Sequence, residues 1–245
     1  MTDKIDIFSI PLYYIGFNKS DSLKNYLEGK GFKNINFFSA VIGKKLDVKD
    51  LARKSIISPS CYYDIIRGRC EGKGFPSKGA IGCSLSHIEL WKKCVNENLP
   101  FMTICEDDLF FEKKIKEDEI IKALKQENGM FLSPNAGDNI NMNKRNVKFF
   151  GTHFYILSKE CCIKLLEKAF PIDIQVDSYI AFMHNINEIN IYGYKIAYQK
   201  SHISSTHQEV FEILNNSRSG LYLIISIIIL IISIFYFNQK CTKKI

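Results

Sequence analysis

Three consecutive carboxylates, Glu106, Asp107 and Asp108, follow directly on the apolar run FMTIC at residues 101–105. A short apolar run bounded by Pro100 and by charges predicts a buried central strand. Such a strand delivers the carboxylates to its C-terminal end, where open α/β sheets bind their ligands. Hard oxygen ligands suit Mg²⁺ or Mn²⁺, which bridge to substrate phosphates and stabilise a leaving diphosphate. The residues alone leave open the plainer alternative, a solvated acidic turn after a strand.

The segment before this run, residues 78–98, has apolar residues at helical spacing and predicts a helix. His87 falls at the edge of its apolar face. Two interpretations are open for His87: a hydrogen-bonded histidine that packs the helix on the sheet, which we favour, or a contact to a bound donor. Gly79 and Gly82 lack a Cβ, so they permit close approach of the helix backbone to the sheet or to a ligand.

Three other histidines are weaker candidates for a metal site. His202 and His207 follow the last predicted strand, in YQKSHISSTH. Imidazole can ligate Mn²⁺, but two histidines in a polar linker are more often solvated. His153 lies within a predicted strand, in GTHFYIL, and we interpret it as structural.

The elements around these residues alternate between strand and helix, which predicts an α/β fold. The chain opens with a strand, a short helix ended by Gly29 and Gly31, and a second strand, the usual start of a parallel sheet. The pattern predicts strands at residues 5–15, 32–41, 101–105, 148–157 and 189–198, further helices at 112–127 and after the N-cap Ser158, and loops at 43–75 and 135–146.

The charge distribution argues against nucleic-acid binding. The formal net charge of the 245 residues is +7, but residues 218–245 carry four basic residues and no acidic one. The remaining 217 residues hold 29 basic against 26 acidic residues, and no basic stripe with interleaved aromatics is present. A nucleic-acid groove needs such a stripe, so we expect no nucleic-acid partner.

Residues 219–237, SGLYLIISIIILIISIFYF, contain no charge and predict one C-terminal transmembrane helix. A buried core helix is the alternative. Asp3 and Asp6 interrupt the N-terminal segment, so no signal peptide is predicted and the catalytic domain is expected in the cytosol, as in a tail anchor. The charges flanking the span, one cation before and three after, favour the opposite orientation. The eight cysteines form no C-x-x-C pair, which fits a reducing compartment and argues against a zinc site.

Four blocks together resemble glycosyltransferase family 25. They are IPLYYIGFNKSDSLKNYL near the start, GAIGCSLSHIELWKKCVNENLPF before the acidic run, KFFGTHFYILSKECCIKLLE and PIDIQVDSYI. The resemblance covers about residues 5–205. It implies a GT-A type, Rossmann-like nucleotide-diphospho-sugar transferase domain. It also implies a UDP-sugar donor, a divalent metal, Mn²⁺ or Mg²⁺, and inversion at the anomeric carbon.

Carried over residue by residue, the resemblance makes Glu106, Asp107 and Asp108 the acidic motif. It implies that Asp108, with Asp107, ligates the metal and that Glu106 contacts the nucleoside sugar. Inversion requires a base that deprotonates the acceptor hydroxyl. Asp177, in the V-D-S-Y segment, is the first candidate and Asp173 the second, while helix capping is the alternative for Asp177.

One departure from the family pattern bears on function. Family members carry arginines after the first strand, whereas NKSDSLKNYL has only Lys19 and Lys24 there. We therefore keep two functions open. The first is an active transferase that moves a hexose, galactose or glucose, to a glycan, lipid-linked or protein hydroxyl acceptor. The second is a degraded, membrane-tethered protein that binds a glycan or nucleotide without turnover. A metal-dependent phosphohydrolase would need a second carboxylate cluster, which the sequence lacks.

The expected organisation has four parts. They are a transferase domain at residues 1–205, a linker at 206–218, the membrane helix at 219–237 and a short basic tail at 238–245.

Overall fold

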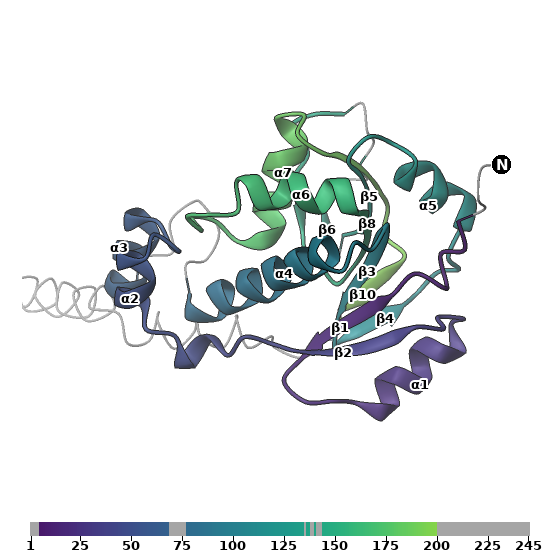
Figure 1. Cartoon of the computed structure of the whole chain (residues 1–245), viewed down its shortest axis with the longest axis horizontal. Coiled ribbons are helices and arrows are strands. Elements are labelled where there is room, and N and C mark those ends of the chain that lie inside the picture. Colours follow the sequence, from purple (N-terminus) through teal and green to yellow (C-terminus); the bar gives the residue numbers. More distant parts are fainter. Residues whose placement is uncertain (1–4, 69–76, 135, 138–139, 141–143, 200–245) are drawn as a thin grey trace, which may run out of the picture.

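The computed structural model describes residues 5–68, 77–134, 136–137, 140 and 144–199 (Figure 1). Its centre is a six-stranded sheet in the order β2-β1-β3-β8-β5-β9. These strands are β1 (Leu12–Gly16), β2 (Ile35–Ser39), β3 (Phe101–Glu106), β5 (Gly129–Ser133), β8 (Phe154–Ser158) and β9 (Asn190–Gly193). Two short pairs accompany the sheet: β4 (Leu109–Phe111) with β10 (Ala197–Gln199), and β6 (Ala136–Gly137) with β7 (Phe149–Phe150).

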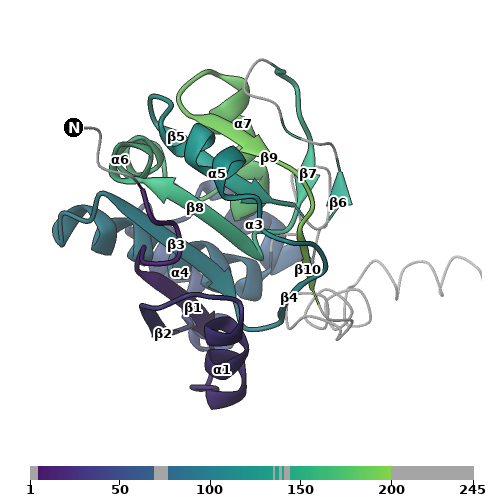
Figure 2. The same cartoon turned by 90° about the vertical axis from the view of Figure 1, so that its right-hand side faces the viewer.

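Helices cover both faces of this sheet, so the fold is a three-layer α/β arrangement (Figures 1 and 2). On one face lie α1 (Asp21–Gly29) and α5 (Glu117–Leu124). On the other lie α4 (Lys78–Asn96), α6 (Lys159–Glu167) and α7 (Val176–Asn185). A 3₁₀ turn η1 (Gly43–Lys45) and the helices α2 (Val48–Arg53) and α3 (Pro59–Arg67) extend beyond the sheet on the α4 side.

Alternate side chains of each central strand enter opposite cores, which is why the strands read as continuous apolar runs. In β3, Met102 and Ile104 face the core under α4 and α6, whereas Cys105 faces the core under α1 and α5. The same alternation sends Tyr155 of β8 to the first core and Phe154 to the second. Burial on both faces holds β3 rigidly, so the residue at its end has a fixed position.

The direction of the strands decides which loops meet at one edge. β1 pairs with β2 and β3 in parallel, as the β-α-β opening predicts. β8 is antiparallel to both β3 and β5, so the sheet is mixed (Figure 2). The start of β8 therefore lies beside the ends of β1 and β3, and the residues before β8 join the acidic run at one edge.

Most predicted elements are confirmed, with shorter boundaries. The helix predicted at 78–98 is α4, with Ser77 as its N-cap, and Ser158 caps α6 through the N–H of Cys161. The central strand at 101–105 is confirmed as β3. The helix predicted at 112–127 is limited to α5, and the strand predicted at 5–15 begins only at Leu12.

The loop predicted at residues 43–75 is wrong for its described part, which holds η1, α2 and α3. α3 begins with Ser58, whose side chain accepts the N–H of Cys61, and with Pro59 at the first helical position. It ends at Gly68, which has a left-handed backbone with φ of 62°. Serine before proline at the start and glycine at the end are ordinary helix boundaries. These residues at 58–68 therefore bound a helix inside the predicted loop.

Two predicted strands are each divided. The strand at 148–157 separates into β7 and β8, because Gly151 adopts a φ of 85° that interrupts the extended backbone. The strand at 189–198 separates into β9 and β10.

Within the described ranges no helix is long and apolar enough to cross a membrane. The span predicted at 219–237, the linker at 206–218 and the basic tail at 238–245 lie outside the described residues, as do His202 and His207. The six described cysteines are all free thiols.

Candidate functional site

The acidic run leaves the sheet at the end of β3, and its three side chains take different directions. Glu106 is the last residue of β3, and its side chain is 23% exposed. Asp107 and Asp108 form the turn into β4. The side chain of Asp108 lies on the same side as Glu106, toward His153. The carboxylate of Asp107 lies instead against Gly16, at the end of β1.

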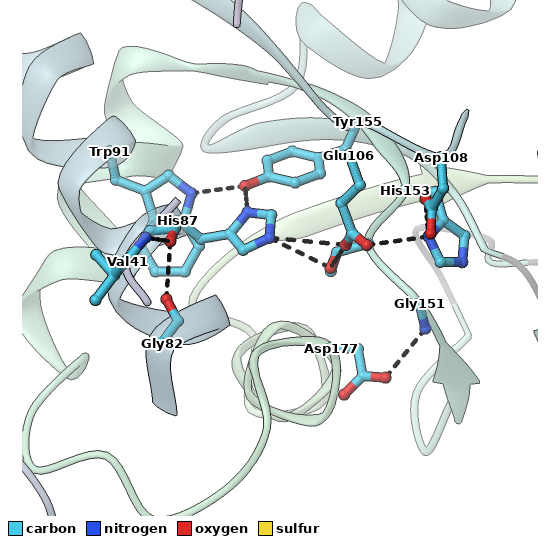
Figure 3. A network of polar contacts seen from close by, with 12 residues as sticks. Val41, Gly82, His87, Trp91, Glu106, Asp108, Gly151, His153, Tyr155 and Asp177 are labelled. Atoms are coloured by element: carbon cyan, nitrogen blue, oxygen red, sulfur yellow. Dashed lines mark hydrogen bonds and ion pairs between the residues drawn. The ribbon is translucent and has the colours of Figure 1, made fainter. Parts of the chain in front are cut away.

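The carboxylate of Glu106 is held by the residues just before β8. Thr152 donates its hydroxyl to Oε1 of Glu106 at 2.8 Å, and Nδ1 of His153 lies 3.3 Å from Oε2. The backbone N–H of Glu106 donates to the carbonyl oxygen of His153 at 3.1 Å. Two side-chain contacts therefore hold this carboxylate at the edge of the sheet (Figure 3), and one backbone hydrogen bond joins the two strand ends.

A buried chain of hydrogen bonds reaches the same carboxylate from α4 (Figure 3). The indole Nε1 of Trp91 donates to the hydroxyl of Tyr155 at 3.1 Å, and this hydroxyl lies 2.7 Å from Nδ1 of His87. Indole nitrogen can only donate, so the Tyr155 hydroxyl uses its own proton toward Nδ1. This assigns the remaining proton of a neutral imidazole to Nε2. Nε2 lies 3.5 Å from the hydroxyl of Thr152 and 3.8 Å from Oε1 of Glu106.

His87 thus occupies the position that the sequence favoured. Its side chain is fully buried between α4 and the sheet. Its Nε2 faces the hydroxyl of Thr152 and Oε1 of Glu106 from the protein interior. Any effect of His87 on a bound donor therefore acts through Glu106 and Thr152. Donor contact by His87 remains a prediction.

The electrostatics of the cluster favour ionised groups. Burial raises the pKa of Glu106, but the charge and hydrogen bond of His153, with a smaller contribution from His87, hold it well below its usual range. Burial lowers the pKa of His153, but the charge of Glu106 and its hydrogen bond outweigh burial and raise it. The two directions agree: Glu106 and a protonated His153 attract each other, and a cation bound at the His153 ring would take the place of that proton.

Glu106, Asp108 and His153 together offer a set of metal-ligand atoms. One ligand atom from each residue lies within 4.8 Å of the other two. Nδ1 of His153 is 4.0 Å from Oδ1 of Asp108, and Nε2 of His153 is buried with no hydrogen-bond partner among the described residues. A buried ring nitrogen without a partner is costly unless a further group uses it. Two carboxylates and an imidazole suit a divalent cation such as Mn²⁺, so the residues present fit the metal that the sequence implies.

A second group, Cys83, His87 and Glu106, also has ligand atoms within 4.8 Å of one another. A thiol binds metal as the thiolate. Burial raises the pKa of Cys83 well above its usual value, and the nearby carboxylates of Glu106, Asp177 and Asp108 raise it further. Cys83 is therefore a neutral thiol, and the Glu106–Asp108–His153 group is the better metal site.

Asp107 is placed by its contact with the first strand. A Cβ built on Gly16 would lie 2.7 Å from Oδ2 of Asp107, so the carboxylate occupies the space that a side chain at position 16 would need. Burial and the charge of Glu106 raise the pKa of Asp107, while the N–H of Phe17 partly offsets them. Asp107 thus faces the β1 end of the edge and is outside the Glu106–Asp108–His153 group.

Gly82 lies against backbone rather than against the acidic cluster. A Cβ at this position would come within 2.5 Å of the carbonyl oxygen of Val41 and 2.9 Å of the backbone nitrogen of Gly43. Ser86 links the same two segments, because its hydroxyl donates to the carbonyl oxygen of Gly82 and accepts the N–H of Val41. The close approach predicted at Gly82 is present, but it is to the segment at residues 41–43 after β2 and not to the sheet, and the contact of Gly82 with a donor remains a prediction.

Gly82→Ala is therefore expected to lower the free energy of unfolding by about 1–3 kcal/mol, as overpacking against rigid backbone does. Urea denaturation measures the change. Gly29→Ala is the matched control, because a Cβ at Gly29, in the last turn of α1, meets no atom within 4 Å. Alanine at position 29 should leave the stability unchanged or raised. Equal stabilities for the two variants would contradict the packing role of Gly82.

The two base candidates, Asp177 and Asp173, take different surroundings. Asp177 lies in the first turn of α7 and is 8% exposed; it accepts the N–H of Gly151 at 3.0 Å through Oδ2. The N-cap position of α7 is Gln175, so Asp177 is not the capping residue. Asp173 accepts hydrogen bonds from the hydroxyls of Ser58 and Ser60, which tie it to the start of α3.

Asp177 therefore touches the segment that carries Thr152 and His153. Its hydrogen bond holds Gly151 immediately before those two residues (Figure 3). The structure brings Glu106, Asp108, His87 and Asp177 to one edge, with Asp107 beside them against β1.

His153 and Thr152 are the site residues that sequence reasoning missed. His153 was interpreted as structural because it fell inside a predicted strand. The signal that could have found it is the pair of polar residues directly after Gly151 and before the apolar run FYIL. A glycine that ends one strand also frees the next residues to turn toward the sheet edge.

Comparisons with known proteins find one family profile and several partial relatives. The family profile described as "Glycosyltransferase family 25 (LPS biosynthesis protein)" matches residues 22–136, which include α4 and the acidic run. A "Putative glycosyltransferase" of Haemophilus influenzae is 35% identical over 123 residues, 44% of this chain and 44% of that protein. The "Lipooligosaccharide biosynthesis protein lex-1" of the same organism is 38% identical over 60 residues, 23% of this chain and 20% of that protein.

A human relative, "Procollagen galactosyltransferase 2", is 28% identical over 137 residues, 56% of this chain and 18% of that protein. The matched segments thus span less than half the length of each of these relatives. Among solved structures, mouse xyloside xylosyltransferase 1 aligns with a TM-score of 0.37 and 10% identity, covering 78% of this chain and 73% of that one. A similarity at that level carries no argument about the fold.

Proposed function

Because this chain belongs to glycosyltransferase family 25 through residues 22–136, we propose that it is a metal-dependent, GT-A type hexosyltransferase. It takes a hexose, galactose or glucose, from a UDP-sugar and transfers it with inversion to an acceptor hydroxyl. The names of its relatives support this reading, since they include a lipooligosaccharide biosynthesis protein and a procollagen galactosyltransferase.

The observation that carries the proposal is the group formed by Glu106, Asp108 and His153 at the end of β3. Ligands of open α/β sheets bind at this edge, so the diphosphate of a nucleotide sugar would meet these side chains. A divalent cation bound there would neutralise the negative charge that gathers on the leaving diphosphate. Without such neutralisation the ionised Glu106 would repel the diphosphate.

Each residue at the edge has a distinct role in the proposal. Asp108 binds the cation directly, and His153 and Glu106 complete the group around it. Glu106, held by Thr152 and supported by His87, orients the nucleoside sugar. Asp107, against Gly16 at the end of β1, contacts the diphosphate part of the donor at the same edge of the sheet.

Asp177 is the proposed base. A carboxylate can take a proton from the acceptor hydroxyl as the hydroxyl attacks the anomeric carbon. Asp177 lies in α7 and accepts the N–H of Gly151, two residues before His153. A base at Asp177 is therefore close to the sheet edge that holds the Glu106–Asp108–His153 group. This position lies beyond residue 136, outside the range that the family profile matches.

The role of Asp107 gives a prediction that needs no change of charge. In Gly16→Ala the new Cβ would lie 2.7 Å from Oδ2 of Asp107, so the carboxylate must rotate away, and 3.0 Å from the Cβ of Asp107, so the turn must shift by a few tenths of an ångström. We expect UDP affinity to fall about threefold to tenfold while the melting temperature changes little, which corresponds to loss of one moderate contact. Calorimetric titration with UDP measures it, with Gly29→Ala as control. Unchanged affinity in Gly16→Ala would remove Asp107 from the donor site.

The proposed function is tested by hydrolysis and transfer assays of the full-length chain with UDP-galactose and UDP-glucose. Release of UDP should require Mn²⁺ or Mg²⁺ and should stop when a chelator is added. Release that proceeds equally with and without metal would contradict the metal-dependent mechanism. Binding of UDP without any release would favour the non-catalytic, nucleotide-binding alternative.

Attachment to the membrane through residues 219–237, with the transferase domain in the cytosol, is part of the same proposal. Its support is the uncharged apolar run in the sequence. Protease protection in sealed vesicles tests it: the domain of residues 1–205 should be digested from the cytosolic side. Full protection of that domain would reverse the orientation.

A further inference from the structure

A cavity of about 280 Å³ lies between α4 and residues 168–182. Its wall is largely made of apolar side chains. They include Ile88 and Trp91 of α4, Ile172, and Val176 and Tyr179 of α7. Lys168 and Asp173 supply the charged groups in its lining. A largely apolar cavity with a few polar groups is the usual form of a small-molecule site.

The cavity shares two elements with the carboxylate cluster. α4 presents Ser84 and Ile88 to the cavity and His87, between them in sequence, to Glu106. The first turn of α7 gives Val176 to the cavity, and the next residue is Asp177, the proposed base. A molecule seated in the cavity would therefore lie directly beside the proposed reaction centre.

Ser84 supplies an independent sign that a ligand belongs there. Its side chain lines the cavity, is only 4% exposed, and its hydroxyl has no hydrogen-bond partner among the described residues. A buried hydroxyl without a partner costs free energy. A ligand that carries a polar atom next to an apolar group would satisfy it.

The size of the cavity limits the apolar group. An engineered protein cavity of about 150 Å³ is large enough for benzene. The present volume of about 280 Å³ thus holds one aromatic ring or a short alkyl chain, with room for a linking atom. A free oligosaccharide carries hydroxyls around the rim of every ring, and buried against Ile88, Ile172 and Val176 those hydroxyls would lack hydrogen-bond partners.

We propose that this cavity receives the apolar aglycone of the acceptor, so that the accepted substrate is a glycoside with an aryl or short alkyl group beside the accepting sugar. This inference rests on the proposed transferase function and names its acceptor class. The glycosidic oxygen accepts a hydrogen bond from Ser84, the aglycone packs against Trp91 and Tyr179, and the sugar hydroxyl points to Asp177.

The test compares phenyl and methyl glycosides of galactose and of glucose as ligands of the full-length chain. Dissociation constants from ligand-observed NMR are measured with UDP and Mn²⁺ present. Burial of the ring should make each phenyl glycoside bind about tenfold or more tightly than its methyl counterpart. Equal binding of the two, or no binding of either, would overturn the inference.

Two variants locate the effect. Ile174→Trp places a large side chain at a half-buried position of the cavity lining and should abolish the phenyl preference. Ile163→Trp is the matched control, because Ile163 is 39% exposed on α6 and does not line the cavity. A phenyl preference that survives Ile174→Trp as fully as Ile163→Trp would place the ring elsewhere and overturn the inference.

Ser84→Ala tests the hydroxyl separately. Removing a buried hydroxyl that lacks a partner should leave the melting temperature unchanged or raised, so the variant folds. Its affinity for the phenyl glycoside should nonetheless fall about threefold to tenfold. Unchanged affinity would show that no ligand atom uses the Ser84 hydroxyl and would overturn the inference.

UDP binding measured on the same samples separates the two levels of the proposal. UDP binding without a phenyl preference would sink the aglycone cavity and leave the transferase function standing. A phenyl preference in a chain that binds no UDP would contradict both the proposed function and the acceptor role of the cavity.

Discussion

Asp108→Ala is expected to lower the affinity for UDP in the presence of Mn²⁺ by about 100-fold or more and to stop release of UDP from UDP-sugar. Loss of groups that only support metal ligands already costs about 10–100-fold, and Asp108 is proposed as a direct ligand. The remaining residues of the group, Glu106 and His153, pair with each other and cannot replace the missing carboxylate. Calorimetric titration with UDP, with and without Mn²⁺, measures the effect.

Asp118→Ala is the matched control for this loss. Asp118 is an exposed carboxylate in the first turn of α5, away from the cluster. The Asp118→Ala variant should bind UDP as tightly as the unchanged protein does. If Asp108→Ala retained metal-dependent UDP binding within about threefold of that control, the cation site would have to lie elsewhere.

Asp177→Asn is expected to reduce turnover by about 10²–10⁴-fold while UDP binding is preserved, because an amide cannot accept the proton of the acceptor hydroxyl. Asparagine keeps an oxygen that can accept the N–H of Gly151, so the segment before β8 should stay in place. Single-turnover kinetics with UDP-sugar and an acceptor glycoside measure the loss.

Asp173→Asn separates the two base candidates. Asp173 accepts hydrogen bonds from Ser58 and Ser60, and asparagine oxygen can still accept them. We expect its turnover to stay within a few-fold of the unchanged protein. A large loss in Asp173→Asn together with nearly full activity in Asp177→Asn would transfer the base role to Asp173.

The central part of this site could be predicted because its signals are local. The apolar run at 101–105 is short and ends in charges, which identified both β3 and the carboxylates that it delivers. Helical spacing identified α4 and placed His87 on the sheet side. Each of these signals lies within a single element or directly after it.

The contribution of β8 could not be predicted, because it depends on strand direction. β8 runs antiparallel between β3 and β5, so Thr152 and His153 at its start meet Glu106 at its neighbour's end. No residue between 148 and 158 indicates that β8 runs antiparallel to its neighbours. Without the direction, His153 reads as one more side chain inside a strand.

The region at 43–67 shows a different limit. Its helices α2 and α3 are short, at 6 and 9 residues, and the sequence predicted a loop there. Ser58 and Pro59 carried the correct signal for α3. Short helices hold few periodic residues, so cap chemistry is then the better guide.

Electron paramagnetic resonance of Mn²⁺ tests the central claim most directly, since it observes the cation at the Glu106–Asp108–His153 group. The full-length chain is titrated with Mn²⁺ in the presence and absence of UDP. We predict that the signal of free Mn²⁺ is lost in proportion to the added protein when UDP is present, and that Asp108→Ala leaves the signal free. A folded, unchanged chain that leaves Mn²⁺ free with and without UDP would contradict the metal-dependent transferase and favour the non-catalytic binding protein.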